Sequence, residues 1–134
     1  MLDFYKNKKI FITGHTGFKG TWLCGVLLQA GANLTGYALE PPSNPSLFIQ
    51  TGMVSDIDSI TGDVRDLENL KKEIKKAKPD IVFHLAAQPI VRFSYDDPVT
   101  TYETNVMGTV NILEALRSAP SAKSFINVTT DKVY

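Results

Sequence analysis

Short apolar segments alternate along the chain with longer segments whose apolar residues recur every three or four positions. The short segments are rich in β-branched and aromatic residues, which is typical of buried parallel strands. There are five of them, at residues 9–13, 34–39, 57–61, 80–85 and 125–128, and the third is the weakest. The pattern therefore predicts five strands separated by helical or irregular connections.

The first helical segment directly follows the first strand. Apolar residues at helical spacing predict a helix from Phe18 to Ala30, and Gly31 ends it as a C-cap residue. The predicted apolar face consists of Phe18, Trp22, Leu23, Val26, Leu27 and Ala30. We expect Trp22 and Cys24 to be core residues, and Cys24 not to be a nucleophile.

Two further helices are predicted. Asp66 is the expected N-cap of a helix that runs through Lys78 and is closed by Pro79. A long helix is expected from Pro98 to Ser118, with one apolar face made of Val99, Tyr102, Val106, Val110, Leu113 and Leu116. Residues 40–50 contain three prolines and are expected to form a loop with one helical turn near Leu47.

Alternation of strands and helices predicts an α/β fold. Parallel strands joined by right-handed crossovers form a doubly wound sheet of the Rossmann type, with expected strand order 3-2-1-4-5. Residues 1–134 are too few for more than one domain. Only residues 129–134 follow the fifth strand, so we expect an incomplete domain, truncated after that strand, whose substrate-binding part lies beyond Tyr134.

Composition narrows the possible partners. Lysine plus arginine and aspartate plus glutamate number 14 each, so the net charge is zero, which disfavours nucleic acid or an anionic membrane as partner. No stretch approaches the roughly 18 apolar residues of a membrane span. Residues 1–9 do not resemble a signal peptide, and a single cysteine is typical of a reducing compartment, so a cytoplasmic location is expected.

The turn after the first strand is the strongest candidate for a binding site. Gly14, Gly17 and Gly20 form a G-x-x-G-x-x-G pattern between a predicted strand and a predicted helix. The first glycine permits a tight turn, the second lets a pyrophosphate approach the backbone, and the third lets the helix pack closely. Free N–H groups at the helix start would bind phosphate oxygens. The alternative is a glycine-rich connection without a ligand.

Other residues of this turn have two possible roles. His15 and Lys19 either contact phosphate or are solvated surface groups. Together with Thr16 and Phe18 they complete the set of candidate cofactor contacts in the turn.

Further candidates follow the carboxyl ends of the other strands, where ligands of open parallel sheets bind. Glu40 is the nearest acid to the adenosine ribose, although Ala38 stands where an acid is common, and a loop surface charge is the alternative. Asp63 is placed to accept a hydrogen bond from the adenine amino group, beside Val64. The fourth strand end contributes Leu85, Ala86, Ala87 and Gln88. No arginine follows the second strand, which favours NAD over NADP, and no metal site is expected.

Together these residues resemble the extended short-chain dehydrogenase/reductase family. The motifs that carry the resemblance are Thr13–Gly20, Gly62–Asp66, His84–Gln88, Asn105–Thr109 and Thr129–Tyr134. Within the family the likeness is to the nucleotide-sugar 4,6-dehydratases that act on CDP-glucose. It rests on residues 14–20, 36–39, 45–48, 86–89, 91–92 and 130–132.

The resemblance implies a mechanism and its residues. Hydride leaves C4 of the sugar for NAD, water is lost across C5 and C6, and hydride returns to C6. By resemblance, Thr130 binds the 4-hydroxyl and Asp131 is the acid toward the departing 6-hydroxyl, so its pKa must be raised. Lys132 stands where dTDP-glucose relatives have a glutamate base, and the identity of the base stays open. Asn105 and Thr129 are added as cofactor contacts.

The resemblance also limits what residues 1–134 are expected to do alone. The family's catalytic Y-x-x-x-K pair lies beyond the fifth strand, and Tyr134 is not that tyrosine. We therefore expect these residues to be inactive without the rest of the protein. A homodimer formed through the helix at Pro98–Ser118 is possible. Two other hypotheses stay open: a nucleotide-sugar epimerase or reductase, and a dinucleotide-binding module without chemistry.

Overall fold

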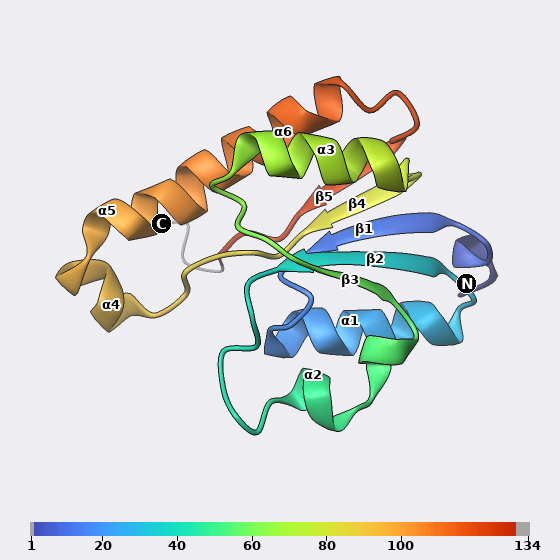
Figure 1. Ribbon diagram of the computed structural model, residues 1–134, viewed down its shortest axis with the longest axis horizontal. Helices are drawn as coiled ribbons and strands as arrows, with labels where there is room; N and C mark the ends of the chain where they lie inside the picture. Colours follow the sequence, from blue (N-terminus) through green and yellow to red (C-terminus); the bar gives the residue numbers. More distant parts are fainter. Residues whose placement is uncertain (1, 131–134) are drawn as a thin grey trace.

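A five-stranded parallel sheet is the centre of the molecule. The computed structural model describes residues 2–130. The strands are β1 (Lys9–Thr13), β2 (Asn33–Ala38), β3 (Asp58–Thr61), β4 (Ile81–His84) and β5 (Ser124–Asn127). All neighbouring pairs are parallel and the order is β3-β2-β1-β4-β5, as predicted (Figure 1).

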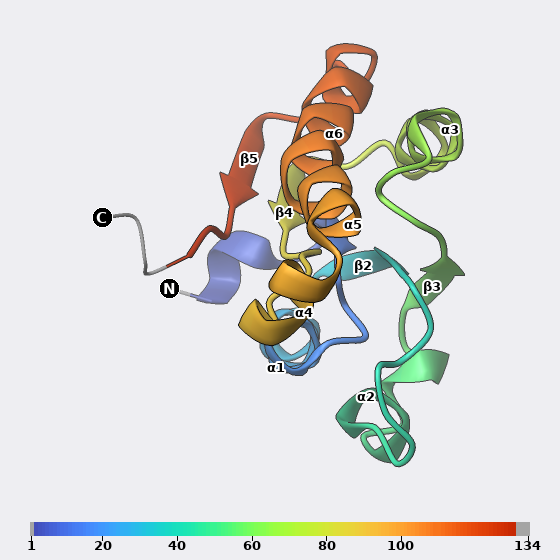
Figure 2. The same cartoon turned by 90° about the vertical axis from the view of Figure 1, so that its left-hand side faces the viewer.

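Helices cover both faces of this sheet. Helices α1 (Phe18–Gln29) and α2 (Leu47–Gln50) lie on one face, and α3 (Leu67–Ala77) and α6 (Gly108–Arg117) on the other (Figures 1 and 2). Shorter elements complete the described chain. They are η1 (Leu2–Tyr5), η2 (Met53–Ser55), α4 (Val91–Asp96), α5 (Pro98–Tyr102) and the π-helical turn η3 (Glu103–Met107).

Each face of the sheet has its own apolar core, because side chains alternate along a strand. Ile10 and Ile12 of β1 belong to the cluster beneath α1. Phe11, between them, belongs with Tyr37 to the cluster beneath α3 and α6. The continuous apolar runs in the sequence therefore reflect burial on both faces.

Helix α1 forms where it was predicted, but it buries only part of the predicted apolar face. The buried residues are Gly20, Thr21, Cys24 and Leu27. Trp22 is 60% exposed and Phe18 is also exposed, so the prediction that Trp22 is a core residue is wrong. Gly20 contacts the backbone of the loop after β1 directly. This contact fixes how the helix is rotated about its own axis, so the side that faces the sheet carries the small residues Gly20, Thr21 and Cys24. Cys24 is buried, as predicted, and burial raises the pKa of its thiol to about 12.

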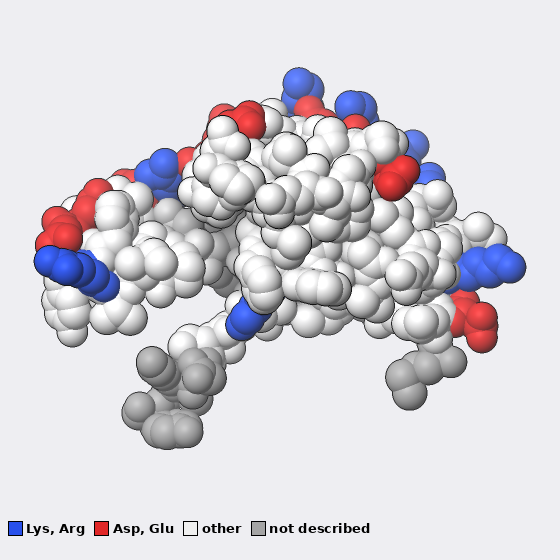
Figure 3. Space-filling view, turned by 90° about the horizontal axis from the view of Figure 1, so that it is seen from below, with Lys and Arg blue, Asp and Glu red and all other residues white. Residues whose placement is uncertain are grey.

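The exposed residues of α1 lie on a face with few charges. Figure 3 shows this side of the molecule, with most acidic and basic side chains near its rim. Phe18, Trp22 and Val26 of the predicted apolar face therefore face outward, whereas Leu27 and Ala30 are buried and Leu23 packs against the core. Exposed apolar patches of this kind commonly mark interaction surfaces.

The helix expected from Pro98 to Ser118 is confirmed in extent but is not regular. It consists of α5, the π turn η3 and α6. Asp97 caps its start by accepting a hydrogen bond from the Thr100 N–H at 3.0 Å. The helix α4 before it was not predicted. A π turn contains one residue more than an α-helical turn. A regular helical period applied to the whole segment therefore assigns some side chains after the π turn to the wrong face.

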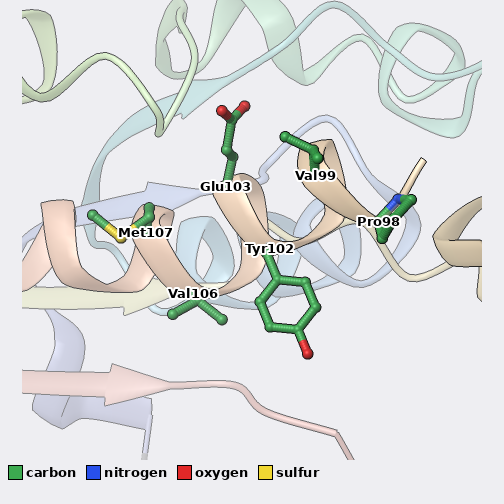
Figure 4. A pocket seen from close by; sticks show the side chains of 6 residues that line it. All are labelled: Pro98, Val99, Tyr102, Glu103, Val106 and Met107. Carbon is green, nitrogen blue, oxygen red and sulfur yellow. The ribbon is translucent and has the colours of Figure 1, made fainter.

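The outer side of this composite helix is apolar and exposed. Val99, Tyr102, Val106, Val110 and Leu113 all project from it into solvent. A shallow pocket on its surface is lined by Pro98, Val99, Tyr102, Glu103, Val106 and Met107 (Figure 4). The predicted apolar face therefore exists, and a partner for it stays a prediction.

The helices of residues 2–130 are short or carry charged residues. None of them is both long enough and apolar enough to cross a bilayer.

Candidate functional site

The candidate site lies where the strand order reverses, between β1 and β4. Here the carboxyl ends of two central strands diverge into loops on opposite faces, which is where open α/β sheets bind ligands. Gly14 continues β1 with φ +76°, and a Cβ on it would lie 2.8 Å from the Ala86 nitrogen. The β1 turn therefore rests directly on the peptide that follows β4, and any side chain at position 14 would separate them.

Gly20 makes a second backbone contact in this turn. A Cβ on Gly20 would lie 2.1 Å from the Gly14 carbonyl oxygen and 2.7 Å from the His15 Cα. Gly20 was expected to let the helix pack close to the sheet. The close approach is present, but the surface that Gly20 meets is the turn itself. Gly17 differs, because its Cβ would meet only the Gly14 oxygen, at 3.4 Å.

The N-terminus of α1 has no side-chain cap. Its N-cap is Gly17, which has no side-chain oxygen to accept from the first N–H groups of the helix. The Thr21 N–H bonds to the Gly17 carbonyl at 2.9 Å, so the N–H groups of Phe18, Lys19 and Gly20 are left without a partner among residues 2–130. Such groups, together with the helix dipole, favour an anion at this position.

His15 is buried, so its predicted role as a solvated surface group is wrong. It is 1% exposed, its Nε2 lies 2.8 Å from the Ser59 hydroxyl, and its ring packs edge-on against Phe48. A Cβ on Gly36 would lie 2.4 Å from the ring. Burial lowers the pKa of His15 to about 4, and the Tyr37 carbonyl opposes this in part. The Nδ1 atom has no hydrogen-bond partner among residues 2–130.

The burial of His15 limits how it can bind a cofactor. Its imidazole lies among the first three strands rather than beside the free amides, so a contact with phosphate would involve its backbone. Phe18 and Lys19 are exposed at the helix start. Their predicted contacts with the cofactor stay predictions.

The ends of β2 and β3 are joined by polar contacts. The Thr16 hydroxyl donates to the Leu39 carbonyl at 3.0 Å, which ties the glycine turn to the end of β2. Glu40 is exposed, and its Oε1 accepts a hydrogen bond from the Thr61 hydroxyl at 3.0 Å. The predicted ribose acid is therefore oriented by the neighbouring strand.

Asp63 forms an ion pair with Arg65. Its Oδ2 accepts from the Arg65 Nη2 at 2.6 Å, and its Oδ1 accepts from the Arg65 N–H at 2.9 Å. These bonds lower the pKa of Asp63, so the group is a carboxylate and only accepts hydrogen bonds. Arg65 Nη1 also lies 3.4 Å from Glu103 of η3. An acceptor held in this way suits the predicted contact with an amino group.

The backbone around Asp63 is held by buried side chains. The Tyr37 hydroxyl donates to the Asp63 carbonyl at 3.0 Å, and Asn111 Nδ2 donates to the Val64 carbonyl at 2.9 Å. Val64 itself is buried. The loop after β3 therefore has a fixed shape before any ligand binds.

The loop after β4 is held at both of its ends. The Thr13 hydroxyl accepts from the N–H groups of Leu85 and Ala86, at 3.1 and 3.2 Å. Asn105 of η3 accepts from the Gln88 N–H at 2.7 Å and donates to the Gln88 carbonyl at 3.0 Å. Between these anchors stands Ala87, which is exposed. The structure therefore brings residues 85–88, which were predicted to contact the cofactor, next to Asn105, which was also predicted to do so.

The predicted catalytic residues follow β5. Thr129 and Thr130 lie exposed after that strand, at the same edge of the sheet as the other strand ends. Asp131 and Lys132 lie outside the described residues. Among residues 2–130, no three His, Cys, Asp or Glu side chains are grouped so that they could hold a metal ion.

Several residues of the site were not predicted. Thr13, Arg65 and Asn111 orient loop backbones, and His84 and Thr109 are linked at 3.3 Å beneath the β4 loop. His84 ends a predicted strand in an apolar run, and a polar side chain buried at such a position normally has a partner. That signal could have identified His84. The partners themselves lie far away in the sequence.

The fold and the glycine turn define a Rossmann-type α/β domain. The profile of the GDP-mannose 4,6 dehydratase family matches residues 11–134, and the chain belongs to that family. The resemblance to extended short-chain dehydrogenases/reductases is thereby confirmed.

Three known proteins illustrate the relationship. A CDP-glucose 4,6-dehydratase of Salmonella typhimurium is 49% identical over 98% of this chain and 37% of its own length. The structure of the epimerase Mth375 of Methanothermobacter thermautotrophicus is 29% identical, with a TM-score of 0.84, over 97% of this chain and 37% of the other. The Bordetella bronchiseptica enzyme WbmG, in complex with NAD and UDP, is 26% identical, with a TM-score of 0.77, over 91% and 37%. The chain spans little more than a third of each.

The glycine contacts predict opposite effects for two alanine substitutions in α1. Gly20→Ala should destabilise the fold by about 3 kcal/mol or more, because its methyl group overlaps backbone that cannot move aside. Gly25→Ala is the matched control, since its methyl group meets only Met53 at 3.7 Å, and it should stabilise by about 0.5–1 kcal/mol. Urea unfolding measures both. Equal effects would contradict the assigned contact.

The buried histidines predict a dependence of stability on pH. The pKa values of His15 and His84 fall to about 4 on folding, from 6.5. The unfolded chain therefore binds more protons between these values, and stability should fall as the pH drops through that window. Each histidine contributes up to about 3 kcal/mol, which is lost by pH 4.

The contribution of His15 to this pH dependence can be separated from that of His84 by substitution. The free energy of unfolding should be measured at about pH 7.5 and about pH 4.5 for the wild type and His15→Gln. The glutamine variant should lose about half of the difference between the two pH values. A wild type equally stable at both would show that the imidazoles are not buried as described.

Proposed function

We propose that the whole protein is an NAD-dependent nucleotide-sugar 4,6-dehydratase that converts CDP-glucose to CDP-4-keto-6-deoxyglucose. The observation that carries the proposal is the uncapped start of α1 at the β1–β4 junction, in a chain 49% identical to a CDP-glucose 4,6-dehydratase. The residues matched by that relative include all the strand ends of the site. As a dehydratase the protein would be a lyase.

The cofactor proposed for this site is NAD. The N–H groups of Phe18, Lys19 and Gly20 would donate to its diphosphate, and Gly17 would leave room for it. Glu40 would accept from the adenosine ribose and Asp63 from the adenine amino group. The Leu85–Gln88 backbone, with Asn105 behind it, would form the wall of the crevice. The WbmG structure, which contains NAD and UDP, supports this assignment.

NAD supplies a reversible hydride acceptor for the sugar. The chain's own groups would orient and protonate the substrate. Thr130 is proposed to bind the 4-hydroxyl and Asp131 to donate a proton to the departing 6-hydroxyl. The assignment of Lys132 as base at C5 requires a neutral amine, and the base stays open. The position of Thr130 at the shared edge of the strands supports its part in the proposal.

A nucleotide-sugar epimerase is the second candidate. The similarity to Mth375, named an epimerase, favours it at the level of the fold and cofactor. Asp131-Lys132 favours the dehydratase, because epimerisation at C4 needs no acid and base for elimination across C5 and C6. A cytoplasmic location and a homodimer are part of the proposal for either enzyme.

Binding of NAD should depend on the backbone at Gly17. Gly17→Ala should keep the fold, since its φ of −77° suits alanine, yet its methyl group would occupy the space proposed for the diphosphate. We expect about tenfold weaker binding of NAD by calorimetry, and weaker binding of NADP than of NAD by the wild type. Gly25→Ala should bind as the wild type does. Unchanged affinity in Gly17→Ala would contradict the proposed diphosphate position.

Product analysis of the whole protein separates dehydratase from epimerase. Incubation with CDP-glucose and NAD should yield a 4-keto-6-deoxy sugar nucleotide, identified by mass spectrometry as substrate minus water. Asp131→Asn should lower the rate about 100-fold or more, because it removes the proposed acid. A product of unchanged mass with inverted C4 would identify an epimerase instead.

A further inference from the structure

His84 lies beneath the β4 loop and has no part in the proposed chemistry. It is 2% exposed, its ring stacks on Phe125 with centroids 6.5 Å apart, and both of its nitrogens contact threonine hydroxyls. Nδ1 lies 2.7 Å from the Thr13 hydroxyl, and Nε2 lies 3.3 Å from the Thr109 hydroxyl. The ring thus connects the end of β1 with the start of α6.

The neighbouring bonds determine which ring nitrogen carries the proton. The Thr13 oxygen already accepts from two backbone N–H groups, those of Leu85 and Ala86, so its own hydrogen is donated to His84 Nδ1. A neutral imidazole then carries its proton on Nε2 and donates it to Thr109. Thr109 in turn donates to the Asn105 carbonyl at 2.8 Å. In this series of hydrogen bonds, from Thr13 through His84 and Thr109 to Asn105, each donor and each acceptor is thereby assigned.

The series closes on the loop from which it starts. Leu85 and Ala86 donate to Thr13, which leads through His84 and Thr109 to Asn105. The side chain of Asn105 holds both the N–H and the carbonyl of Gln88. Residues 85–88 are therefore enclosed by a ring of hydrogen bonds, and His84 is the member that joins its two halves.

We propose that His84 is a positioning residue, which as the Nε2–H tautomer couples β1 to the π turn and thereby holds the Leu85–Gln88 backbone in the shape of a crevice wall. The benefit to a dinucleotide rests on the proposed function, whereas the positioning of the loop does not. A π turn suits this task, because its extra residue lets Asn105 face the loop while Thr109 faces the ring.

Thr109→Val tests the proposal most selectively, since it removes the hydroxyl and keeps the shape of the side chain. Thr109→Ser restores the hydroxyl. Thr104→Val is the matched control, because Thr104 lies in the adjoining π turn and its hydroxyl bonds to no other residue of the described chain. The full chain is used throughout.

The first measurement is ¹⁵N NMR of the His84 ring at neutral pH. We expect a protonated Nε2 and an unprotonated Nδ1, and the opposite tautomer would overturn the proposal. The second is amide hydrogen exchange. In Thr109→Val, exchange should accelerate about tenfold at Ala86 and Gln88, while Ile12 and Val82 in the central strands stay unchanged.

The outcomes of the exchange measurement are distinct. Wild-type rates in Thr109→Ser and Thr104→Val, with local acceleration in Thr109→Val, support the positioning role. An equal acceleration at Ile12 and Val82, or none at Ala86 and Gln88, overturns it. NAD affinity is measured on the same samples, and about fivefold weaker binding is expected only in Thr109→Val. A wild type that does not bind NAD contradicts the proposed function, and the exchange rates still decide the positioning role.

Discussion

Direct contact between backbones at the junction of β1 and β4 is the constraint on which the rest of the site depends. Gly14 rests on the peptide between Leu85 and Ala86, and Gly20 rests on Gly14. Three segments of chain therefore approach one another without intervening side chains. This approach brings the start of α1 to the strand ends and rotates the helix, which leaves its largest apolar side chains outside the core.

The same junction explains why polar side chains are buried nearby. Backbone groups that leave a sheet must still be hydrogen-bonded, and an unpaired buried group is costly. Thr13, Asn105 and Asn111 satisfy these groups in the loops after β3 and β4. Their contacts shape the loops in advance, so a ligand would meet a wall that is already ordered. The first turn of α1 is the exception, since the N–H groups of Phe18, Lys19 and Gly20 have no partner among residues 2–130.

The fold could be predicted from the sequence because its signals are local. The spacing of apolar residues and the turn residues identified all five strands and their order, and placed the ends of α1 and α3 to within one residue. The buried face of α1 could be predicted only in part. Gly20 packs directly on the backbone of the turn, where an added Cβ would lie 2.1 Å from the Gly14 oxygen, and this packing leaves Trp22 at the surface. The π turn at Glu103–Met107 was hidden for a related reason. A single extra residue shifts the helical period without changing the composition of the segment.

The candidate site was predictable to the extent that its residues stand at strand ends. Gly14–Gly20, Glu40, Asp63 and the loop at 85–88 do so, and the structure brings them to one edge of the sheet. His15 shows the limit of this reasoning, because its position in the turn did not reveal that its ring points back to Ser59 and Phe48. His84 and Thr109 were missed, since their connection spans residues far apart in the chain.

In the proposed function, the free amides of the first turn of α1 bind the diphosphate of NAD. A ¹H–¹⁵N NMR titration of the chain with NAD tests it most directly. We expect the largest shifts at the amides of Phe18, Lys19 and Gly20, followed by Ala86 and Ala87. Shifts concentrated instead in the groove between α1 and α2, at Trp22, Leu47 and Met53, would contradict it.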